Sequence, residues 1–462
     1  MGPHEMHVDD TIAAIATPLG EGGIAVIRIS GPEALVVADR CFEPAGRSAE
    51  RLPAAASHTI HYGHIVREGR TVDEVLASVM RAPRTFTKED VVEITCHGGL
   101  LPARMVLDAV LANGARLAEP GEFSKRAFLN GRIDLAQAEA ILDLIHSKTE
   151  LALRAANEQL AGRLSRRINV LREQMLNCLA HVEAHIDFPE EDIAPDTKEQ
   201  LVARLKSGIG AMDELLATAG EGRLLRRGIR VGIIGRPNAG KSSLLNALLG
   251  HDRAIVSHIP GTTRDTIEET ANIRGLPVVF IDTAGLHDAR DEIELEGIRR
   301  SRKTLEDAEL ILYVIDASEP FHESERPFLE GGENGKQLLV LNKSDLPLRL
   351  NLPPELAVKA VSVSCVTGAG LEKLKDRIKE RVWAGKTDAS MFEVMINSRH
   401  QEALARARSA AVRALEALER EQTLELVAMD LRISLNAIGE IVGQTTTEDL
   451  LDRIFSQFCI GK

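Results

Sequence analysis

The sequence of 462 residues has few aromatic residues, no long apolar run and no excess of positive charge. Aromatic residues make up 3% of the chain, so we do not expect a broad surface on which nucleic-acid bases stack. The formal net charge of −13 argues against general attraction to nucleic acid, and DNA is not an expected partner. No apolar run reaches the roughly 18 residues of a membrane span, and the N-terminus lacks the apolar core of a signal peptide. We therefore expect a cytoplasmic protein without a membrane anchor.

Cysteine is also sparse, and its spacing excludes two common roles. The five cysteines are scattered and never form a CxxC pair, so the sequence predicts neither a disulfide framework nor a structural zinc site. Cys178 belongs to an apolar stripe that steps by three or four residues from Leu164 to Ile186, which indicates core packing in a long amphipathic helix. Cys96 and His97 are adjacent, but without a third, orienting group a structural turn is favoured over a catalytic pair.

Three patterns follow one another along the chain. Residues 10–125 alternate short β-like runs with Gly and Pro and contain one helical stretch near residues 101–114, which is an α+β pattern. Residues 133–219 have a helical pattern, and residues 229–382 alternate apolar runs with helical segments, as in a doubly wound parallel sheet. The helical pattern returns after residue 385. This order predicts a helical domain into which an α/β domain is inserted.

A phosphate-binding loop is predicted at residues 235–242. This segment matches G-x-x-x-x-G-K-[ST], follows a predicted strand and precedes an apolar helix. Glycines allow backbone N–H groups to curl around phosphate oxygens, and the helix N-terminus adds its dipole. Lys241 is then expected to reach the β- and γ-phosphates of a nucleotide, and the Ser242 hydroxyl to bind Mg²⁺.

Two further motifs complete the nucleotide site, and the second of them identifies the base. Asp282 begins a segment Asp-Thr-Ala-Gly in which the carboxylate can hold Mg²⁺ through water and the Gly285 N–H can meet the γ-phosphate. Residues 342–345 resemble the NKxD signature of GTPases, whose carboxylate accepts two guanine N–H groups that adenine cannot offer. GTP is therefore the expected nucleotide.

The segment Ser364-Cys365-Val366 begins within the last two residues of a β-like run predicted at residues 357–365 and stands where GTPases carry SAK. It departs from SAK at two positions, so we expect guanine contacts there from the backbone. The nucleotide-binding residues predicted from all these motifs are Asn238, Ala239, Gly240, Lys241, Ser242, Ser243, Ser257, Ile259, Gly261, Thr262, Thr263, Asp282, Thr283, Ala284, Gly285, Asn342, Lys343, Asp345, Ser364, Cys365 and Val366.

Activation of water must differ from that in Ras-like GTPases, because Leu286 occupies the position of their water-orienting Gln. Residues 261–265, GTTRD, look like a switch-one segment with Thr263 as the second Mg²⁺ ligand. Asn238 resembles the asparagine of potassium-activated GTPases, although local turn geometry is an alternative reason for an Asn there. The K⁺ ligands expected on this basis are Asn238, Ser257, Ile259 and Thr262.

Over essentially its whole length, the chain resembles the bacterial MnmE (TrmE) family of tRNA wobble-uridine modification GTPases. The resemblance is carried by residues 10–31, 120–141, 235–250, 260–265, 282–298 and the terminal FCIGK at 458–462. It implies a multidomain α/β and α+β fold. The domains expected are an N-terminal α+β tetrahydrofolate-binding and dimerisation domain at 1–127, an all-α helical domain at 128–227, an inserted Ras-like P-loop GTPase domain at 228–383, and the second part of the helical domain with the tail at 384–462.

The resemblance also implies an activity and partners. The family forms homodimers and works with an FAD-dependent protein, MnmG (GidA), in a heterotetramer or larger complex, so FAD belongs to the partner only. Together they would add a carboxymethylaminomethyl or aminomethyl group to position 5 of the wobble uridine of tRNA. A tetrahydrofolate derivative, 5-formyl- or methylene-tetrahydrofolate, would supply the one-carbon unit.

Folate-binding residues are carried over where the local motif agrees. Arg28, Glu93 and Arg132 fall where the family contacts the folate, and some relatives carry Lys at the last position. As lone residues they would be ordinary surface or strand positions. The tail would bring Lys462 near the folate and Cys459 near the one-carbon unit, as a nucleophile or as a required contact.

Glu294 aligns with the family's catalytic glutamate and would orient the attacking water through a bridging water; a solvated helix face is the alternative. Arg264 and Asp265 are expected to stabilise the switch on dimerisation of the GTPase domains.

Two other functions are less consistent with the sequence. An Era-like ribosome-assembly GTPase would carry a KH module after its GTPase domain, where this chain has a helical pattern. A prenylated signalling GTPase would also place a cysteine fourth from the end, but Lys462 is a poor final residue for that modification.

Overall fold

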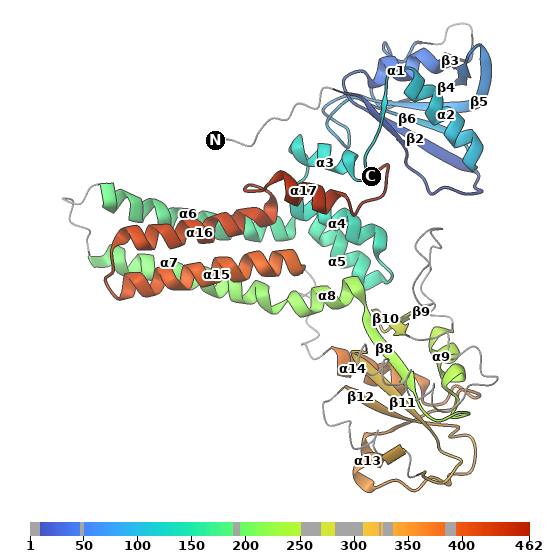
Figure 1. Cartoon of the computed structure of the whole chain (residues 1–462), viewed down its shortest axis with the longest axis vertical. Helices are drawn as coiled ribbons and strands as arrows, with labels where there is room; N and C mark the ends of the chain where they lie inside the picture. The colour runs from blue at the N-terminus through green and yellow to red at the C-terminus, as the bar shows by residue number, and fades with distance from the viewer. Residues whose placement is uncertain are drawn as a thin grey trace. The chain divides into compact units, whose positions relative to one another are not determined.

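The computed structural model describes residues 10–46, 50–187, 195–250, 269–281, 308–322, 325–326, 336–383 and 394–462. The chain divides into two compact units (Figure 1). The first unit comprises Met1–Leu142, Leu160–Ile209 and Ala403–Lys462, and the second comprises Asp143–Gln159 and Gly210–Glu402. Each unit therefore combines segments that are distant in the sequence.

A seven-stranded sheet forms the N-terminal part of the first unit, in the order β3-β4-β5-β6-β2-β1-β7. Neighbouring strands are antiparallel except β1 and β7, which are parallel. The strands are β1 (Ile12–Ile15), β2 (Ile24–Ser30), β3 (Phe42–Pro44), β4 (Thr59–Arg67), β5 (Arg70–Met80), β6 (Val91–His97) and β7 (Arg116–Leu117). Alternate residues of β2 are buried, which is the pattern of a strand with one face on the core.

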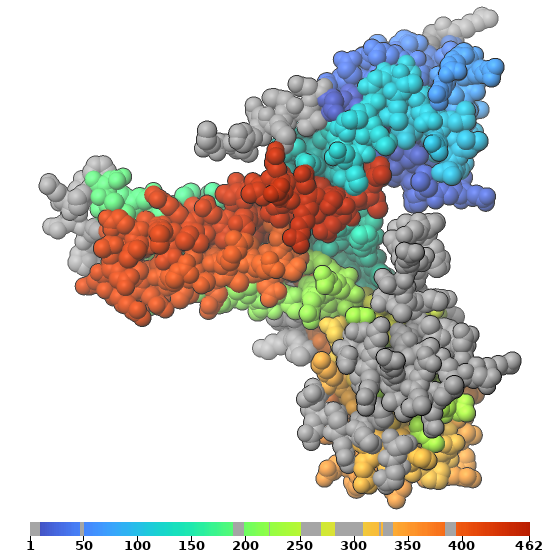
Figure 2. All heavy atoms as spheres, viewed as in Figure 1, coloured from blue at the N-terminus to red at the C-terminus, as the bar shows by residue number. Residues whose placement is uncertain are grey.

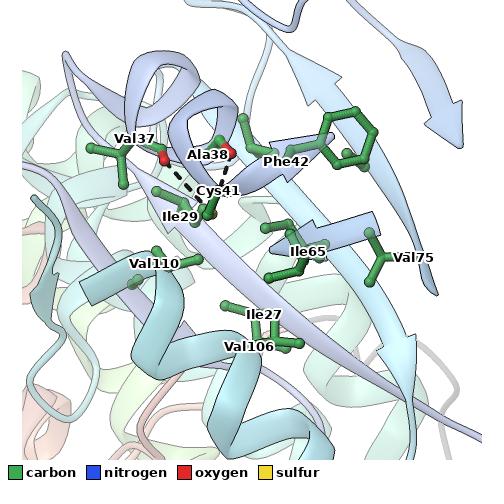
Figure 3. Close-up of a cluster of buried hydrophobic side chains, with 14 of the residues drawn as sticks. Ile27, Ile29, Val37, Ala38, Cys41, Phe42, Ile65, Val75, Val106 and Val110 are labelled. Carbon is green, nitrogen blue, oxygen red and sulfur yellow. Dashed lines mark hydrogen bonds between the residues drawn. The ribbon is translucent and has the colours of Figure 1, made fainter. Parts of the chain in front are cut away.

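The helices α1 (Ala34–Cys41) and α2 (Leu100–Ala112) pack on this sheet (Figure 3). Ile27 of β2 and Val106 of α2 belong to the same buried cluster. The Cys41 thiol is buried there, and this burial raises its pKa to about 11. The α+β pattern predicted for the N-terminal region is confirmed, although α1 was not predicted.

Helices of 8 to 25 residues form the rest of the first unit. They are α3 (Glu122–Leu129), α4 (Leu135–His146), α6 (Arg163–Asp187), α7 (Pro195–Ala217), α15 (Ser398–Glu419), α16 (Leu424–Val442) and α17 (Glu448–Phe455), of which α4, α7 and α15 extend into the second unit. The helix α6 lies along α16 (Figure 1). The stripe predicted from Leu164 to Ile186 is buried as far as Val182, Cys178 included, and Ile186 is partly buried. Figure 2 shows α15, α16 and α17 as one continuous orange-to-red surface.

The second unit contains a six-stranded sheet in the order β13-β12-β11-β8-β10-β9. All pairs are parallel except β9 and β10. The strands are β8 (Ile229–Ile234), β9 (Glu269–Ile273), β10 (Leu276–Ile281), β11 (Leu310–Asp316), β12 (Gln337–Asn342) and β13 (Val361–Ser362). The helices of this unit are α5 (Glu150–Leu160), α8 (Ala219–Arg227), α9 (Lys241–Leu249), α13 (Pro354–Lys359) and α14 (Leu371–Val382).

Both faces of this sheet are buried. Leu312 of β11 belongs to one apolar cluster, whereas its neighbour Tyr313 belongs to another. A sheet covered on both faces is the doubly wound arrangement that the alternating pattern predicted. The β-like run predicted at residues 357–365 was wrong in its first part, because α13 begins at Pro354 and continues to Lys359. Proline at the first helical position favours a helix there.

In the part of the chain that the structure describes, no helix has the length and apolar character needed to cross a membrane.

Candidate functional site

The phosphate-binding loop connects the carboxyl end of β8, an interior strand of the sheet, to α9. Gly240 precedes α9 with a φ of +91°, and a Cβ placed on it would lie 2.1 Å from Nδ2 of Asn342. Only glycine fits both the backbone angle and this close approach. The loop therefore presents its backbone at the N-terminus of α9, where N–H groups and the helix dipole favour a phosphate.

Lys241 is held by the loop itself. Its ammonium Nζ donates hydrogen bonds to the carbonyl oxygens of Gly235 and Arg236, both at 2.9 Å. Burial lowers the pKa of Lys241, because little water surrounds the charge. Ser242 and Ser243 follow in the first turn of α9, so a bound phosphate would meet the ammonium and this turn together.

Two predicted guanine-binding segments meet the loop at the end of β12. Asn342 is 2% exposed, and its Nδ2 donates to the carbonyl oxygen of Ala239 at 3.0 Å. The thiol of Cys365 donates to Oδ1 of the same amide at 3.2 Å. The side chain of Val366 is exposed. The structure thus brings the phosphate-binding loop, Asn342 and the segment that begins at Ser364 together at the carboxyl ends of the parallel strands.

Lys343 and Asp345 follow directly after β12, at the same ends of the strands. Lys343 has a φ of +62° and its ammonium pairs with Asp316, at the end of β11. Burial tends to raise the pKa of Asp316, but the Lys343 ammonium and hydrogen bonds from Ser318 hold it below its usual range. Asp345 is exposed and open to a base that approaches from solvent.

Some predicted site residues lie outside the described residues. They are Ser257, Ile259, Gly261, Thr262, Thr263, Arg264, Asp265, Asp282, Thr283, Ala284, Gly285 and Glu294.

A second cluster of polar side chains lies on the N-terminal sheet. Arg28 of β2 and Glu93 of β6 are direct partners in the strand register. Their side chains are partly buried, and Nε of Arg28 lies 2.8 Å from Oε1 of Glu93. The carboxylate and the guanidinium therefore share one face of the sheet and orient each other.

Two aromatic rings lie near the Arg28 guanidinium of this ion pair. The guanidinium carbon of Arg28 lies 5.8 Å from the ring centre of Phe86 and 5.7 Å from that of Phe123. The guanidinium carbon of Arg132 lies 4.9 Å from the Phe86 ring centre. Phe86 thus contacts two cations, an arrangement favoured by the negative face of an aromatic ring. Sequence reasoning missed Phe86, since no spacing rule marks it.

The loop that carries Phe86 is fixed by a buried cation. The side chain of Arg126 is 2% exposed and pairs with Asp10, Glu89 and Glu122. Ser30 of β2 also donates to Glu89, at 2.6 Å. Burial tends to raise the pKa of Glu122, but the guanidinium of Arg116 and that of Arg126 keep it below its usual range.

The end of the chain reaches the same cluster. Phe458 is buried against α4 and α17. Nη1 of Arg28 donates to the carbonyl oxygen of Gly461 at 3.4 Å. Cys459 is exposed and Lys462 is partly buried. The structure thus brings Arg28, Glu93, Arg132 and the tail together.

Cys96 and His97 point to opposite sides of β6. Cys96 is buried, which raises its pKa to about 11. His97 is exposed, and its Nδ1 lies 2.7 Å from Oδ1 of Asp73, which raises the pKa of the imidazole. Successive strand residues alternate between faces, so these two side chains do not form a catalytic pair.

Comparison with known proteins places the chain in a family. The model of the MnmE helical domain matches residues 135–459, and the model of the GTP-binding protein TrmE N-terminus matches residues 11–132. The tRNA modification GTPase MnmE of Geobacillus thermodenitrificans is 49% identical over 98% of this chain and 99% of its own length. The chain belongs to the MnmE family of tRNA modification GTPases. The MnmE of Geobacter metallireducens is 48% identical over 99% of this chain and 100% of its own length.

Among solved structures, the G domain of the T. maritima FeoB iron transporter is 31% identical over 33% of this chain and 98% of that chain, with a TM-score of 0.25. Membership of the MnmE family, together with the two sheets and the helical segments described above, confirms the predicted multidomain α/β and α+β fold.

Proposed function

We propose that this GTPase of tRNA modification is activated by K⁺ and, with an MnmG-type FAD protein, adds a carboxymethylaminomethyl or aminomethyl group to position 5 of the wobble uridine. The observation that carries the proposal is the presence of two separate polar sites in one MnmE-family chain. One site is a phosphate-binding loop joined to Asn342, and the other is the cluster around Arg28. The phosphate-binding loop fits a nucleotide. The Arg28 cluster fits an anionic ligand that also carries a polar ring.

The nucleotide site fits GTP with Mg²⁺. Lys241 Nζ is already bound to two carbonyl oxygens, a donor geometry that phosphate oxygens can take over. Ser242 and Thr263 would hold Mg²⁺, and the carbonyl and amide oxygens of Asn238, Ser257, Ile259 and Thr262 would hold K⁺. Bound near the β- and γ-phosphates, these cations would neutralise the charge that develops on hydrolysis. Glu294 would orient the attacking water, because Leu286 cannot.

The Arg28 cluster fits a tetrahydrofolate derivative. The Glu93 carboxylate can accept N–H groups from a pterin edge, and the cations Arg132 and Lys462 can face the glutamyl carboxylates. Phe86, whose ring lies near both guanidinium groups, would add an apolar contact for the ligand. The folate, as 5-formyl- or methylene-tetrahydrofolate, would supply the one-carbon unit, and Cys459 would stand near it.

The proposal includes assembly. Two chains would form a homodimer, and two GTPase domains would approach each other when GTP and K⁺ bind, with Arg264 and Asp265 stabilising the closed switch. FAD would be held by the MnmG-type partner, in a heterotetramer or larger complex. Hydrolysis would then drive an open–closed cycle that is linked to the modification of tRNA.

Nucleosides of tRNA from a strain that lacks this protein test the proposal. Mass spectrometry should show wobble uridines without the position-5 group, and the chain expressed in that strain should restore it. Unchanged uridines together with a ribosome-assembly defect would favour the Era-like alternative. Hydrolysis rates in KCl and in NaCl test the cation, and equal rates would exclude activation by K⁺.

A further inference from the structure

The backbone of Gly461 is constrained by its φ angle and by its close approach to β1. Its φ is +95°, in the left-handed region that favours glycine. A Cβ placed on it would lie 2.5 Å from the carbonyl oxygen of Ile15 and 3.0 Å from Cα of Ala16. These neighbours are backbone atoms at the end of β1, which cannot rotate away as a flexible side chain would. Any larger residue at this position must therefore push the tail off β1.

The tail, residues 458–462, is held at two points. At one end Phe458 is 4% exposed and packs against Phe455, and the N–H of Gly121 donates to the carbonyl oxygen of Cys459 at 3.4 Å. At the other end Gly461 is buried against β1. Between these points Cys459 and Ile460 are exposed. The fixed ends thus determine where the thiol can lie.

Gly461 also acts on Arg28. The guanidinium uses Nε for Glu93, at 2.8 Å, and Nη1 for the Gly461 carbonyl, at 3.4 Å. A guanidinium presents its donors in a rigid plane, so two partners on different nitrogens define the orientation of that plane. Removal of the Gly461 carbonyl takes away one of the two hydrogen bonds that orient this plane and leaves the bond to Glu93 and the contacts with Phe86 and Phe123.

We propose that Gly461 is a positioning residue: by lying against Ile15 and Ala16 it fixes both the Cys459 thiol and the Arg28 guanidinium around the folate site. The inference rests on the folate site of the proposed function. It adds a requirement for a residue without a side chain at 461, because only such a residue can bring the tail within reach of Arg28. Gly461→Ala is therefore expected to displace residues 459–462 as a unit.

The displacement of the tail can be measured by the reactivity of the Cys459 thiol, which bound folate should protect. The full-length protein is treated with a maleimide in the presence and absence of 5-formyltetrahydrofolate, and labelling of Cys459 is followed by peptide mass spectrometry. In the unsubstituted chain, bound folate should slow the labelling of Cys459. In Gly461→Ala the protection should fall at least about tenfold, since a backbone clash and a strained φ together exceed the 1.4 kcal/mol of a tenfold change.

Gly69→Ala is the matched control. Gly69 has a φ of +73° and lies in the same unit, but a Cβ there would meet nothing within 4 Å. The control therefore introduces similar backbone strain without a clash, and its thiol protection should equal that of the unsubstituted chain. GTP hydrolysis and the melting temperature, measured on each variant, verify that the protein is folded.

A chain that ends at Phe458 supplies the reference for a lost tail. Gly461→Ala should match its folate affinity. Full protection in Gly461→Ala, or unchanged folate affinity in the shortened chain, would overturn the role of Gly461. Absence of protection in the unsubstituted chain would instead contradict the placement of Cys459 beside the folate, and the inference would then fail.

Discussion

The two polar sites are built in opposite ways. The phosphate-binding loop occupies consecutive residues between β8 and α9, and its geometry comes from the backbone. The Arg28 cluster draws on separate segments, and the partners Arg28 and Gly461 are 433 residues apart in sequence. A site of the first kind depends on local conformation, whereas a site of the second kind depends on the whole unit being folded. A substitution in one site should therefore change the ligand binding or activity of that site and leave the other site unchanged.

The largest effect is expected from Lys241→Ala. Loss of the ammonium that faces the phosphates should lower kcat/KM for GTP hydrolysis by roughly 10²–10³-fold. Phosphate release measures this effect. Binding of 5-formyltetrahydrofolate, measured by calorimetry, should stay the same because the Lys241 ammonium hydrogen-bonds to its own loop, in the unit that does not contain the Arg28 cluster. An equal fall in folate affinity would mean that the sites are not independent.

Gly240→Ala should come next. The new methyl group would meet the Asn342 amide at 2.1 Å and the backbone would keep an unfavourable φ, so we expect a loss of roughly 1–3 kcal/mol in the free energy of unfolding. GTP affinity should fall as well. Denaturant unfolding and binding of a fluorescent GTP analogue measure these two effects. Gly368→Ala is the control, because it has a φ of +79° with open space around it. Equal losses of unfolding free energy in both variants would mean that backbone strain alone destabilises Gly240→Ala, and that the contact with Asn342 does not.

Arg28→Met tests the distributed site. It removes the ion pair with Glu93 and the donor to the tail, and should weaken folate binding by roughly 10–100-fold, which corresponds to the 1–3 kcal/mol of a lost charged hydrogen bond. GTP hydrolysis by the same variant should be preserved. Arg70→Met, on β5 of the same sheet, controls for the loss of one positive charge. Retained folate affinity in Arg28→Met would exclude the cluster as the binding site.

Cys365→Ala should have a smaller effect on the nucleotide site. It removes one weak donor to Asn342, so guanine-nucleotide affinity should fall by about two- to fivefold, or roughly 0.5–1 kcal/mol. Titration with a fluorescent GDP analogue measures it. Cys365→Ser keeps a donor and should bind GDP as the unsubstituted chain does. If both variants bind alike, the thiol does not orient Asn342.

The smallest effect concerns pH. Hydrogen bonding to Asp73 raises the pKa of His97 in the folded state above its unfolded value of about 6.5. The pair therefore stabilises fully below that unfolded value, and the contribution disappears as pH rises through the raised folded value. The difference in melting temperature between the unsubstituted chain and Asp73→Asn should shrink from pH 5.5 to pH 8.5. A constant difference would show that the histidine does not titrate in this range.

The same contrast explains what could be predicted from the sequence. The phosphate-binding loop and Asn342 could be found because glycine, lysine and asparagine stand at fixed spacings next to predicted strands. The stripe on α6 could be found because its period is helical. Phe86 could not be found, because its role arises only when the loop held by Arg126 is placed beside β2. The constraint on Gly461 depends on β1, so no local pattern reveals it.

The helix α13 shows how a local pattern can mislead. The run at residues 357–365 is apolar enough for a strand, but Pro354 begins a helix and only Val361–Ser362 joins the sheet. Short apolar runs do not distinguish a strand from a helix, and the flanking residues decide between them.

The pairing of α6 with α16 also has a consequence for synthesis of the chain. The end of α6 at Asp187 and the start of α16 at Leu424 are 237 residues apart (424 − 187). At about 5–20 residues per second, a ribosome needs roughly 12 to 47 s to make that stretch. During this time the apolar stripe of α6 lacks α16 while the inserted unit emerges and folds. The part of the stripe that α16 covers therefore stays without its partner during this time, and the length of the chain between the two helices sets the delay.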